Sequence, residues 1–300
     1  MIISASRRTD IPACYADWFF HRLEEGYLLV RNPVRYHQVS KVSLSPEQVD
    51  GIVFWTKNPS PMLDRLEELR AYAYYFQFTL TAYGRDIEPN EPSKNDVLIG
   101  AFRHLCDSLG PNRVIWRYDP VLFSTKYTLA YHMEYFFQIA RRLQGAAGTC
   151  VLSFLDLYKN TEANLRGLGL QPMDDPSIRA FSAFASKTAR DFGISVKTCA
   201  ESISLEEYGI GHGKCIDGKL LDAIRGYPAK ASKDKNQRPH CGCDASVDIG
   251  MYNTCPNGCL YCYANYKKDA AFAAFQSHDP ASPLLIGRVE AGDEIRERKG

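Results

Sequence analysis

The sequence predicts an α/β fold in which a parallel sheet forms a partial or full TIM-like β/α barrel. Short apolar runs rich in β-formers alternate with longer helical patterns along all 300 residues, which is the order of repeated strand and helix units. Several runs are almost continuously apolar, as strands buried on both faces of a sheet require. The length also suits one barrel with short attachments.

Seven segments have the composition of strands, namely residues 2–6, 51–55, 74–80, 113–118, 150–155, 194–198 and 246–251. Helical spacing occurs in residues 13–25, 61–70, 95–109, 129–143, 176–192 and 262–275. Pro61 and Pro176 suit the first turns of their helices. Residues 1–208 are therefore expected to form barrel units joined by right-handed connections.

The last third of the chain departs from this rhythm. Glycines at 209, 211, 213, 218 and 226 predict a loop-rich, cysteine-containing insertion over residues 209–245. Residues 246–285 then supply a strand, a loop and a helix that complete the barrel. Residues 286–300 are charged and are expected to form a solvated tail.

Composition limits the classes of partner. The chain has 45% hydrophobic residues, and its 36 basic side chains almost balance 35 acidic ones, so no broad field favours nucleic acid as an obligate partner. The first twelve residues lack the apolar core of a signal peptide, and no run is long and apolar enough to span a membrane. We expect a cytoplasmic protein without a membrane partner, in which ten cysteines point to metal or cluster binding rather than disulfides.

Polar side chains follow six of the predicted strands, at residues 6–10, 56–58, 79–83, 117–119, 156–158 and 197–201. In a barrel these positions meet on one face, so they predict a polar cavity mouth; the alternative is that loops are polar because they are exposed. We expect Lys57, Arg117 and Asp119 to act on substrate there, with Arg117 gripping a carboxylate. The alternative for Arg117 is a structural ion pair with Asp119.

The segment CPNGCLYC, residues 255–262, places Cys255, Cys259 and Cys262 within eight positions. Three thiolates can hold an iron-sulfur cubane and leave its fourth iron open to a small molecule. Zinc is the main alternative, because it also takes thiolates at such spacing, although a structural zinc site needs four ligands.

This spacing, with Tyr261 before the third cysteine, resembles the Cys-x3-Cys-x-aromatic-Cys motif of the radical S-adenosylmethionine superfamily. The resemblance implies that a 4Fe-4S cluster binds the amino and carboxylate groups of S-adenosylmethionine, with Tyr261 beside the adenine. An electron, from a donor such as ferredoxin or flavodoxin, then cleaves the sulfonium and yields a 5′-deoxyadenosyl radical that abstracts hydrogen from a substrate. The sequence does not identify that substrate.

In the superfamily the motif follows the first barrel strand, whereas here it lies near the C-terminus. A circular permutation reconciles the two, with residues 246–251 as the first strand and residues 2–6 as the second. The glycine-glycine-glutamate segment of the superfamily has no clear counterpart after residue 6. Arg7, Arg8 and Asp10 are expected to replace it in binding S-adenosylmethionine.

Four further cysteines, Cys199, Cys215, Cys241 and Cys243, are expected to form a second centre that holds an iron-sulfur cluster or zinc. Free thiols, or a ligand donated to the first cluster, are the alternatives. Cys14, Cys106 and Cys150 lie in apolar patterns and are assigned to packing.

Residues 3–12, 53–59, 114–120 and 241–243 resemble a microbial family catalogued as a domain of unknown function, over nearly the whole chain. That family is similar, remotely, to the spore photoproduct lyase branch of radical enzymes. The sequence thus predicts a radical S-adenosylmethionine enzyme. A non-catalytic iron-sulfur or zinc protein and a nucleic-acid repair or modification enzyme are the alternatives.

Overall fold

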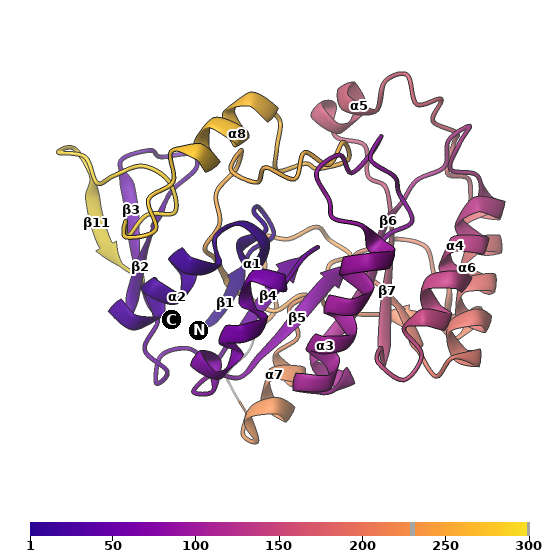
Figure 1. Ribbon diagram of the computed structural model, residues 1–300, viewed down its shortest axis with the longest axis horizontal. Coiled ribbons are helices and arrows are strands. Elements are labelled where there is room, and N and C mark those ends of the chain that lie inside the picture. The colour runs from indigo at the N-terminus through magenta and orange to yellow at the C-terminus, as the bar shows by residue number, and fades with distance from the viewer. Residues whose placement is uncertain (229–231, 299–300) are drawn as a thin grey trace.

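The computed structural model describes residues 1–228 and 232–298, and its centre is an eight-stranded, wholly parallel sheet (Figure 1). The strand order is β10 (Val247–Asp248), β1 (Ile2–Ala5), β4 (Gly51–Thr56), β5 (Tyr74–Thr79), β6 (Val114–Val121), β7 (Thr149–Phe154), β8 (Ser195–Thr198) and β9 (Gly211–His212). All seven predicted strands are present. In the described residues β10 and β9 form the two open edges, so the fold is a partial TIM-like α/β sheet.

A strand from the N-terminus and a strand from the last fifth of the chain are neighbours in this sheet. β1 pairs with β4 on one side and with β10 on the other, with Ile3 opposite Val247. The C-terminal strand expected before the cysteine motif is thereby the parallel neighbour of the N-terminal strand, as the sequence predicted. Apolar runs made β1 and β4 recognisable, whereas β9 has only two residues and no apolar pattern.

Helices follow the expected order with altered ends. They are α1 (Ile11–Cys14), α2 (Ala16–Glu25), the 3₁₀ helix η1 (Ser60–Leu69), the π-helix η2 (Lys94–Leu98), α3 (Ile99–Leu109), the 3₁₀ helix η3 (Pro111–Arg113), α4 (Leu129–Arg142), α5 (Lys159–Leu165), α6 (Asp175–Asp191), the 3₁₀ helix η4 (Glu206–Tyr208), α7 (Gly218–Arg225) and α8 (Lys268–Gln276). The helix predicted from residue 13 is interrupted at Tyr15.

The helix predicted to begin at Cys262 begins only at Lys268. The Asn253 side chain accepts hydrogen bonds from the backbone N–H groups of Tyr266 and Lys267, both at 2.9 Å. These bonds keep the chain after the third motif cysteine in a loop. That loop remains against the cavity instead of turning away as a helix.

The two faces of the sheet have different partners. The face that α2, α3, α4 and α6 cover holds the main apolar core, which includes Phe19, Phe54, Phe76, Phe102, Trp116 and Phe181. The opposite face contributes Val53, Tyr75 and Ile115 to a smaller core with Leu221 of α7. The predicted insertion, residues 209–245, therefore includes a helix that covers this inner face.

A second sheet of three strands uses the predicted tail. Its order is β11 (Glu294–Glu297), β3 (Gln38–Ser43) and β2 (Tyr27–Arg31). β11 pairs in parallel with β3, and Arg31 Nη2 donates to Asp293 Oδ2 at 2.7 Å just before it. All four residues of β11 are exposed and three of them are charged, so the strand had no apolar signal. None of the described helices combines the length and the hydropathy that crossing a bilayer requires.

Candidate functional site

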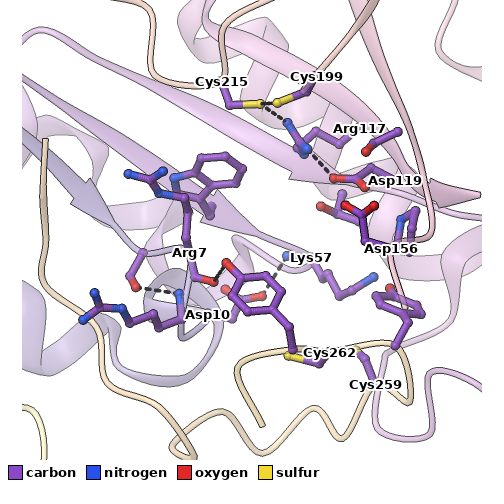
Figure 2. Close-up of a pocket in the computed structure, with 18 of the residues that line it drawn as sticks. Arg7, Asp10, Lys57, Arg117, Asp119, Asp156, Cys199, Cys215, Cys259 and Cys262 are labelled. Carbon is purple, nitrogen blue, oxygen red and sulfur yellow. Dashed lines mark hydrogen bonds and ion pairs between the residues drawn. The ribbon is translucent and has the colours of Figure 1, made fainter. Parts of the chain in front are cut away.

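A cavity of about 410 Å³ lies where the carboxyl ends of the central strands meet (Figure 2). This is the size of a small-molecule site and the place where parallel α/β folds bind ligands. Every residue that the sequence predicted for catalysis, cofactor binding or metal binding lines it: Arg7, Arg8, Asp10, Lys57, Arg117, Asp119, Cys199, Cys215, Cys241, Cys243, Cys255, Cys259, Tyr261 and Cys262. The fold thus brings together residues from both ends of the chain.

The motif loop forms one wall. Cys259 is buried, and its pKa and that of Cys262 are raised by burial, for Cys262 to about 11. The loop is held by hydrogen bonds from Leu260 N to Ile87 O at 3.0 Å and from Asn265 Nδ2 to Cys255 O at 2.6 Å. The three thiols are therefore presented by a loop with fixed backbone partners.

A buried network of charged groups that the sequence did not reveal holds Tyr261. The buried Glu88 carboxylate accepts a hydrogen bond from the Tyr261 hydroxyl and one from Thr81 Oγ1. It also forms ion pairs with Lys57 and Lys94, each with N···O of 2.6 Å. Glu88 lies in a polar stretch with no motif, so only the fold could identify it.

The charged groups of this network shift one another's pKa values. Burial alone would raise the pKa of Glu88, but the two ammonium groups lower it to about 2. Burial opposes the charge of Lys57 as well, yet the Glu88 carboxylate and, less strongly, Cys259 raise its pKa above the usual value. Lys57 therefore remains a cation close to the motif cysteines.

Two further carboxyl groups lie near the motif loop. Asp10 accepts hydrogen bonds from the backbone N–H groups of Lys57 at 2.8 Å and Ala13 at 3.0 Å, and burial raises its pKa to about 6. Burial raises the pKa of Glu91 to about 7, and its Oε1 has no hydrogen-bond partner in the described chain. Both groups can exchange protons near neutrality.

Cys14 is not only a packing residue. Its thiol donates to Asn257 Oδ1 at 3.6 Å, and a hydrogen bond to Cys255 raises its pKa. A fourth thiol thus lies beside the motif. Cys106 and Cys150 are buried in the main core, as predicted.

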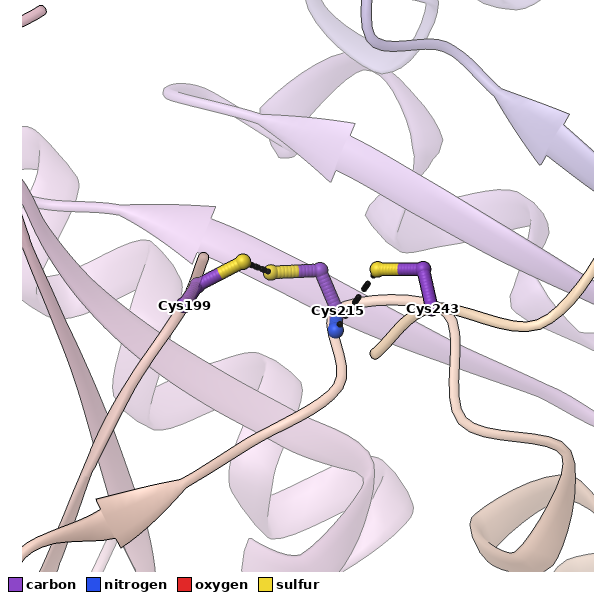
Figure 3. A group of neighbouring side chains, drawn as sticks. All are labelled: Cys199, Cys215 and Cys243. Atoms are coloured by element: carbon purple, nitrogen blue, oxygen red, sulfur yellow. Dashed lines mark hydrogen bonds between the residues drawn. The ribbon is translucent and has the colours of Figure 1, made fainter. Parts of the chain in front are cut away.

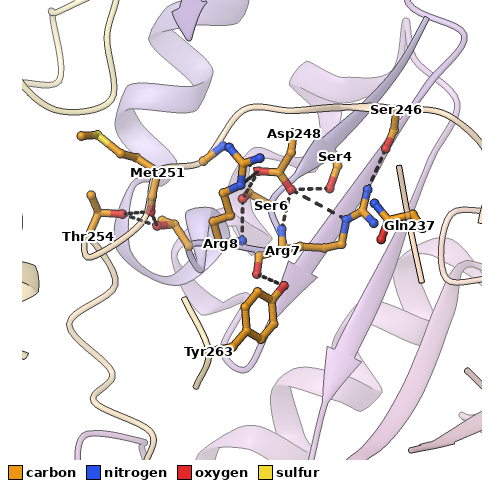
Figure 4. A network of polar contacts seen from close by, with 12 residues as sticks. Ser4, Ser6, Arg7, Arg8, Gln237, Ser246, Asp248, Met251, Thr254 and Tyr263 are labelled. Carbon is orange, nitrogen blue, oxygen red and sulfur yellow. Dashed lines mark hydrogen bonds and ion pairs between the residues drawn. The ribbon is translucent and has the colours of Figure 1, made fainter. Parts of the chain in front are cut away.

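Asp248 of β10 organises the N-terminal wall (Figure 4). Its carboxylate accepts hydrogen bonds from Ser4 Oγ at 3.0 Å, Ser6 Oγ at 2.6 Å and the backbone N–H of Arg7 at 2.8 Å. The guanidinium groups of Arg7 and Arg8 reach the same carboxylate at 3.9 and 4.0 Å. The network joins β10 to β1 and places Arg7 and Arg8 at the cavity wall.

The second set of cysteines lies on the far side of the cavity from Cys259 and Cys262 (Figure 2). The sulfur atoms of Cys199, Cys215 and Cys243 all lie within 4.8 Å of one another (Figure 3). Arg117 Nη1 donates to Cys215 Sγ at 2.8 Å, and its Nη2 is paired with Asp119. Arg117 therefore forms an ion pair with Asp119, which was the alternative to binding a substrate carboxylate. Such a carboxylate would have to displace Asp119.

Among the described residues, the three motif cysteines do not form so close a group. In the described chain, only Cys199, Cys215 and Cys243 have three ligand atoms within 4.8 Å, which is the spacing of a single metal ion. A cubane gives each thiolate its own iron and so needs wider spacing. Asn265 Oδ1 beside this wall is buried without a hydrogen-bond partner among the described residues. The donor set and this orphaned atom fit a bound group of several atoms.

Comparison with known families gives one match. The model of a family described as "Domain of unknown function (DUF1848)" matches residues 2–264. No curated protein and no solved structure matches the chain. The chemistry must therefore be inferred from the cavity itself.

Proposed function

Because the chain belongs to the DUF1848 family, whose description assigns no reaction, we propose from its cavity that it is a radical S-adenosylmethionine enzyme. The observation that carries the proposal is the arrangement of Cys255, Cys259, Cys262 and Tyr261 on one wall of a cavity at the carboxyl ends of a parallel sheet. Three thiolates suit a cubane with one open iron. The substrate is a molecule small enough, or with an end narrow enough, to enter about 410 Å³.

In this proposal Cys255, Cys259 and Cys262 hold the 4Fe-4S cluster. When bound, the cluster supplies the electron that cleaves S-adenosylmethionine to methionine and a 5′-deoxyadenosyl radical. Lys57 places a cation near Cys259 and favours a reduced, more anionic centre. Glu88 fixes the Tyr261 ring through its hydroxyl, so that the ring can pack against an adenine without reorganising.

Charged groups of the N-terminal wall suit the amino acid part of S-adenosylmethionine. Arg7 and Arg8 line the cavity and retain N–H groups that can bind a carboxylate. Asp10 can accept a hydrogen bond from an amino group, and such a cation would favour the ionised form of this buried carboxyl. These are the residues expected to replace the glycine-glycine-glutamate segment.

The strand order supports the circular permutation. β10 precedes the motif loop and lies beside β1, so β10 takes the place of a first barrel strand and β1 that of a second. We include in the proposal a cytoplasmic, reducing setting and an electron donor such as ferredoxin or flavodoxin. Both follow from the need for a low-potential electron.

One observation favours a second candidate, a non-catalytic iron-sulfur protein. Cys14 lies beside Cys255, and a fourth thiolate ligand would close the cluster to S-adenosylmethionine. The proposed enzyme requires Cys14 to remain outside the coordination sphere.

Product formation tests the proposal. The full-length chain, reconstituted with iron and sulfide without oxygen, is incubated with S-adenosylmethionine and dithionite, and 5′-deoxyadenosine is measured. We expect product from the wild type and from the core control Cys106→Ala, and none from Cys259→Ala. A wild-type sample with a full cluster and no product would contradict the proposal, as would equal product from Cys259→Ala.

A further inference from the structure

The cysteines on the opposite wall form a centre of a different kind. We propose that Cys199, Cys215, Cys241 and Cys243 bind a single zinc ion in a closed tetrathiolate site that attaches the segment after β8 to the sheet. This inference does not depend on the radical chemistry proposed for the motif loop.

The four thiols come from three parts of the chain. Cys199 follows β8, Cys215 lies between β9 and α7, and Cys241 and Cys243 precede β10. Cys199 and Cys215 have their sulfur atoms 2.6 Å apart, and Cys241 packs in the same buried cluster as Cys215 and Cys243. Four sulfur ligands converging from distant positions are typical of structural zinc sites.

The surroundings suit thiolates rather than packed thiols. The backbone N–H groups of Cys215 and Ile216 donate to Cys243 Sγ at 3.3 and 3.4 Å. The buried Arg117 guanidinium contacts Cys215 Sγ at 2.8 Å. A zinc ion with four thiolates carries a net negative charge, and these donors would offset it.

The distances between the sulfur atoms suit a single metal ion better than a cubane cluster. Zinc–sulfur bonds of about 2.3 Å in a tetrahedron place the sulfur atoms about 3.8 Å apart. The sulfur atoms of Cys199, Cys215 and Cys243 lie within 4.8 Å of one another, so small side-chain movements reach that geometry. A cubane requires its ligands to be farther apart, because each thiolate binds a different iron.

The backbone around the site is already connected. Cys215 O accepts hydrogen bonds from Tyr75 OH at 2.7 Å and Gln77 Nε2 at 2.9 Å, both on β5. Asp244 N donates to Ile216 O at 3.0 Å, which joins the two cysteine segments. An ion here would close these connections and hold α7 over the inner face of the sheet. It would also fix Arg117, and through it Asp119, at the cavity wall.

Metal counting on full-length protein tests the assignment. We expect one zinc per chain in the wild type, in the motif variant Cys255→Ser and in the core control Cys150→Ala, and background zinc in Cys243→Ser. Cobalt substituted into Cys255→Ser should give the intense absorption of tetrahedral cobalt thiolate. That measurement decides the question even if Cys243→Ser does not fold.

Two results would overturn the inference. One is iron and sulfide in Cys255→Ser, at the level of a second cluster, that Cys243→Ser lacks. The other is a folded Cys255→Ser protein that binds neither zinc nor cobalt. Failure of S-adenosylmethionine cleavage alone would not affect it, so the two proposals fail separately.

Discussion

Replacing Glu88 by Gln should destabilise the protein by about 3 kcal/mol. The change keeps the shape of the side chain but removes the charge that two buried ammonium groups share, those of Lys57 and Lys94. A pKa lowered from 4.5 to about 2 corresponds to about 3 kcal/mol of stabilisation. Removing one partner of a buried ion pair typically costs about 3–5 kcal/mol, a range that includes the value from the pKa shift.

The sign of the pH dependence follows from the same values. Above pH 4.5 the carboxylate is ionised in the folded and unfolded chains, and its full contribution is present; it is lost as the pH falls from 4.5 toward 2. The measurement is urea unfolding of wild type and Glu88→Gln at pH 7, at equal metal content. Glu68→Gln is the matched control, because Glu68 pairs with Arg65 at the surface and should cost less than about 1 kcal/mol. Equal losses in the two variants would refute the assigned role of Glu88.

Three other changes test separate parts of the structure. Gly250→Ala should cost about 1–3 kcal/mol in urea unfolding, because the new Cβ would lie 2.7 Å from Ser6 Cβ. Gly148→Ala, whose nearest neighbour is at 3.5 Å, should be near wild type. Equal costs in the two variants would contradict the close approach of Gly250 to Ser6. Burial lowers the pKa of His132 from 6.5 to about 4, so wild type should lose about 3 kcal/mol between pH 6.5 and 4, and His132→Gln should lack this component. Parallel pH profiles would show that His132 is not buried neutral. Cys14→Ala should retain its iron and its S-adenosylmethionine cleavage, and loss of the cluster would make Cys14 a ligand.

Much of the cavity lining could be predicted from the sequence, because the carboxyl ends of parallel strands lie at the same edge of the sheet. Lys57 and Arg117 are recognisable as residues at or after apolar runs, and the fold brings them together with cysteines from the other end of the chain. The neighbouring positions of β10 and β1 followed from the placement of the motif. The residues of β1 by themselves gave no indication that β10 would be its neighbour.

Other features depend on tertiary contacts that leave no local pattern. The role of Glu88 depends on its contacts with two lysines and Tyr261, which are distant in sequence or carry no motif. Cys14 has the apolar setting of a packing residue, and only the fold places it beside Cys255. The late start of α8 depends on hydrogen bonds to Asn253, which override the helical spacing after Cys262.

The central claim is that the motif cluster has an iron open to S-adenosylmethionine. Electron paramagnetic resonance of the anaerobically reduced wild-type protein, with and without S-adenosylmethionine, tests it, because zinc bound at the opposite wall has no unpaired electron and adds no signal. We predict that S-adenosylmethionine changes the spectrum of the reduced cluster, because it binds the open iron directly. An unchanged spectrum at saturating S-adenosylmethionine, with the cluster fully assembled, would contradict the account.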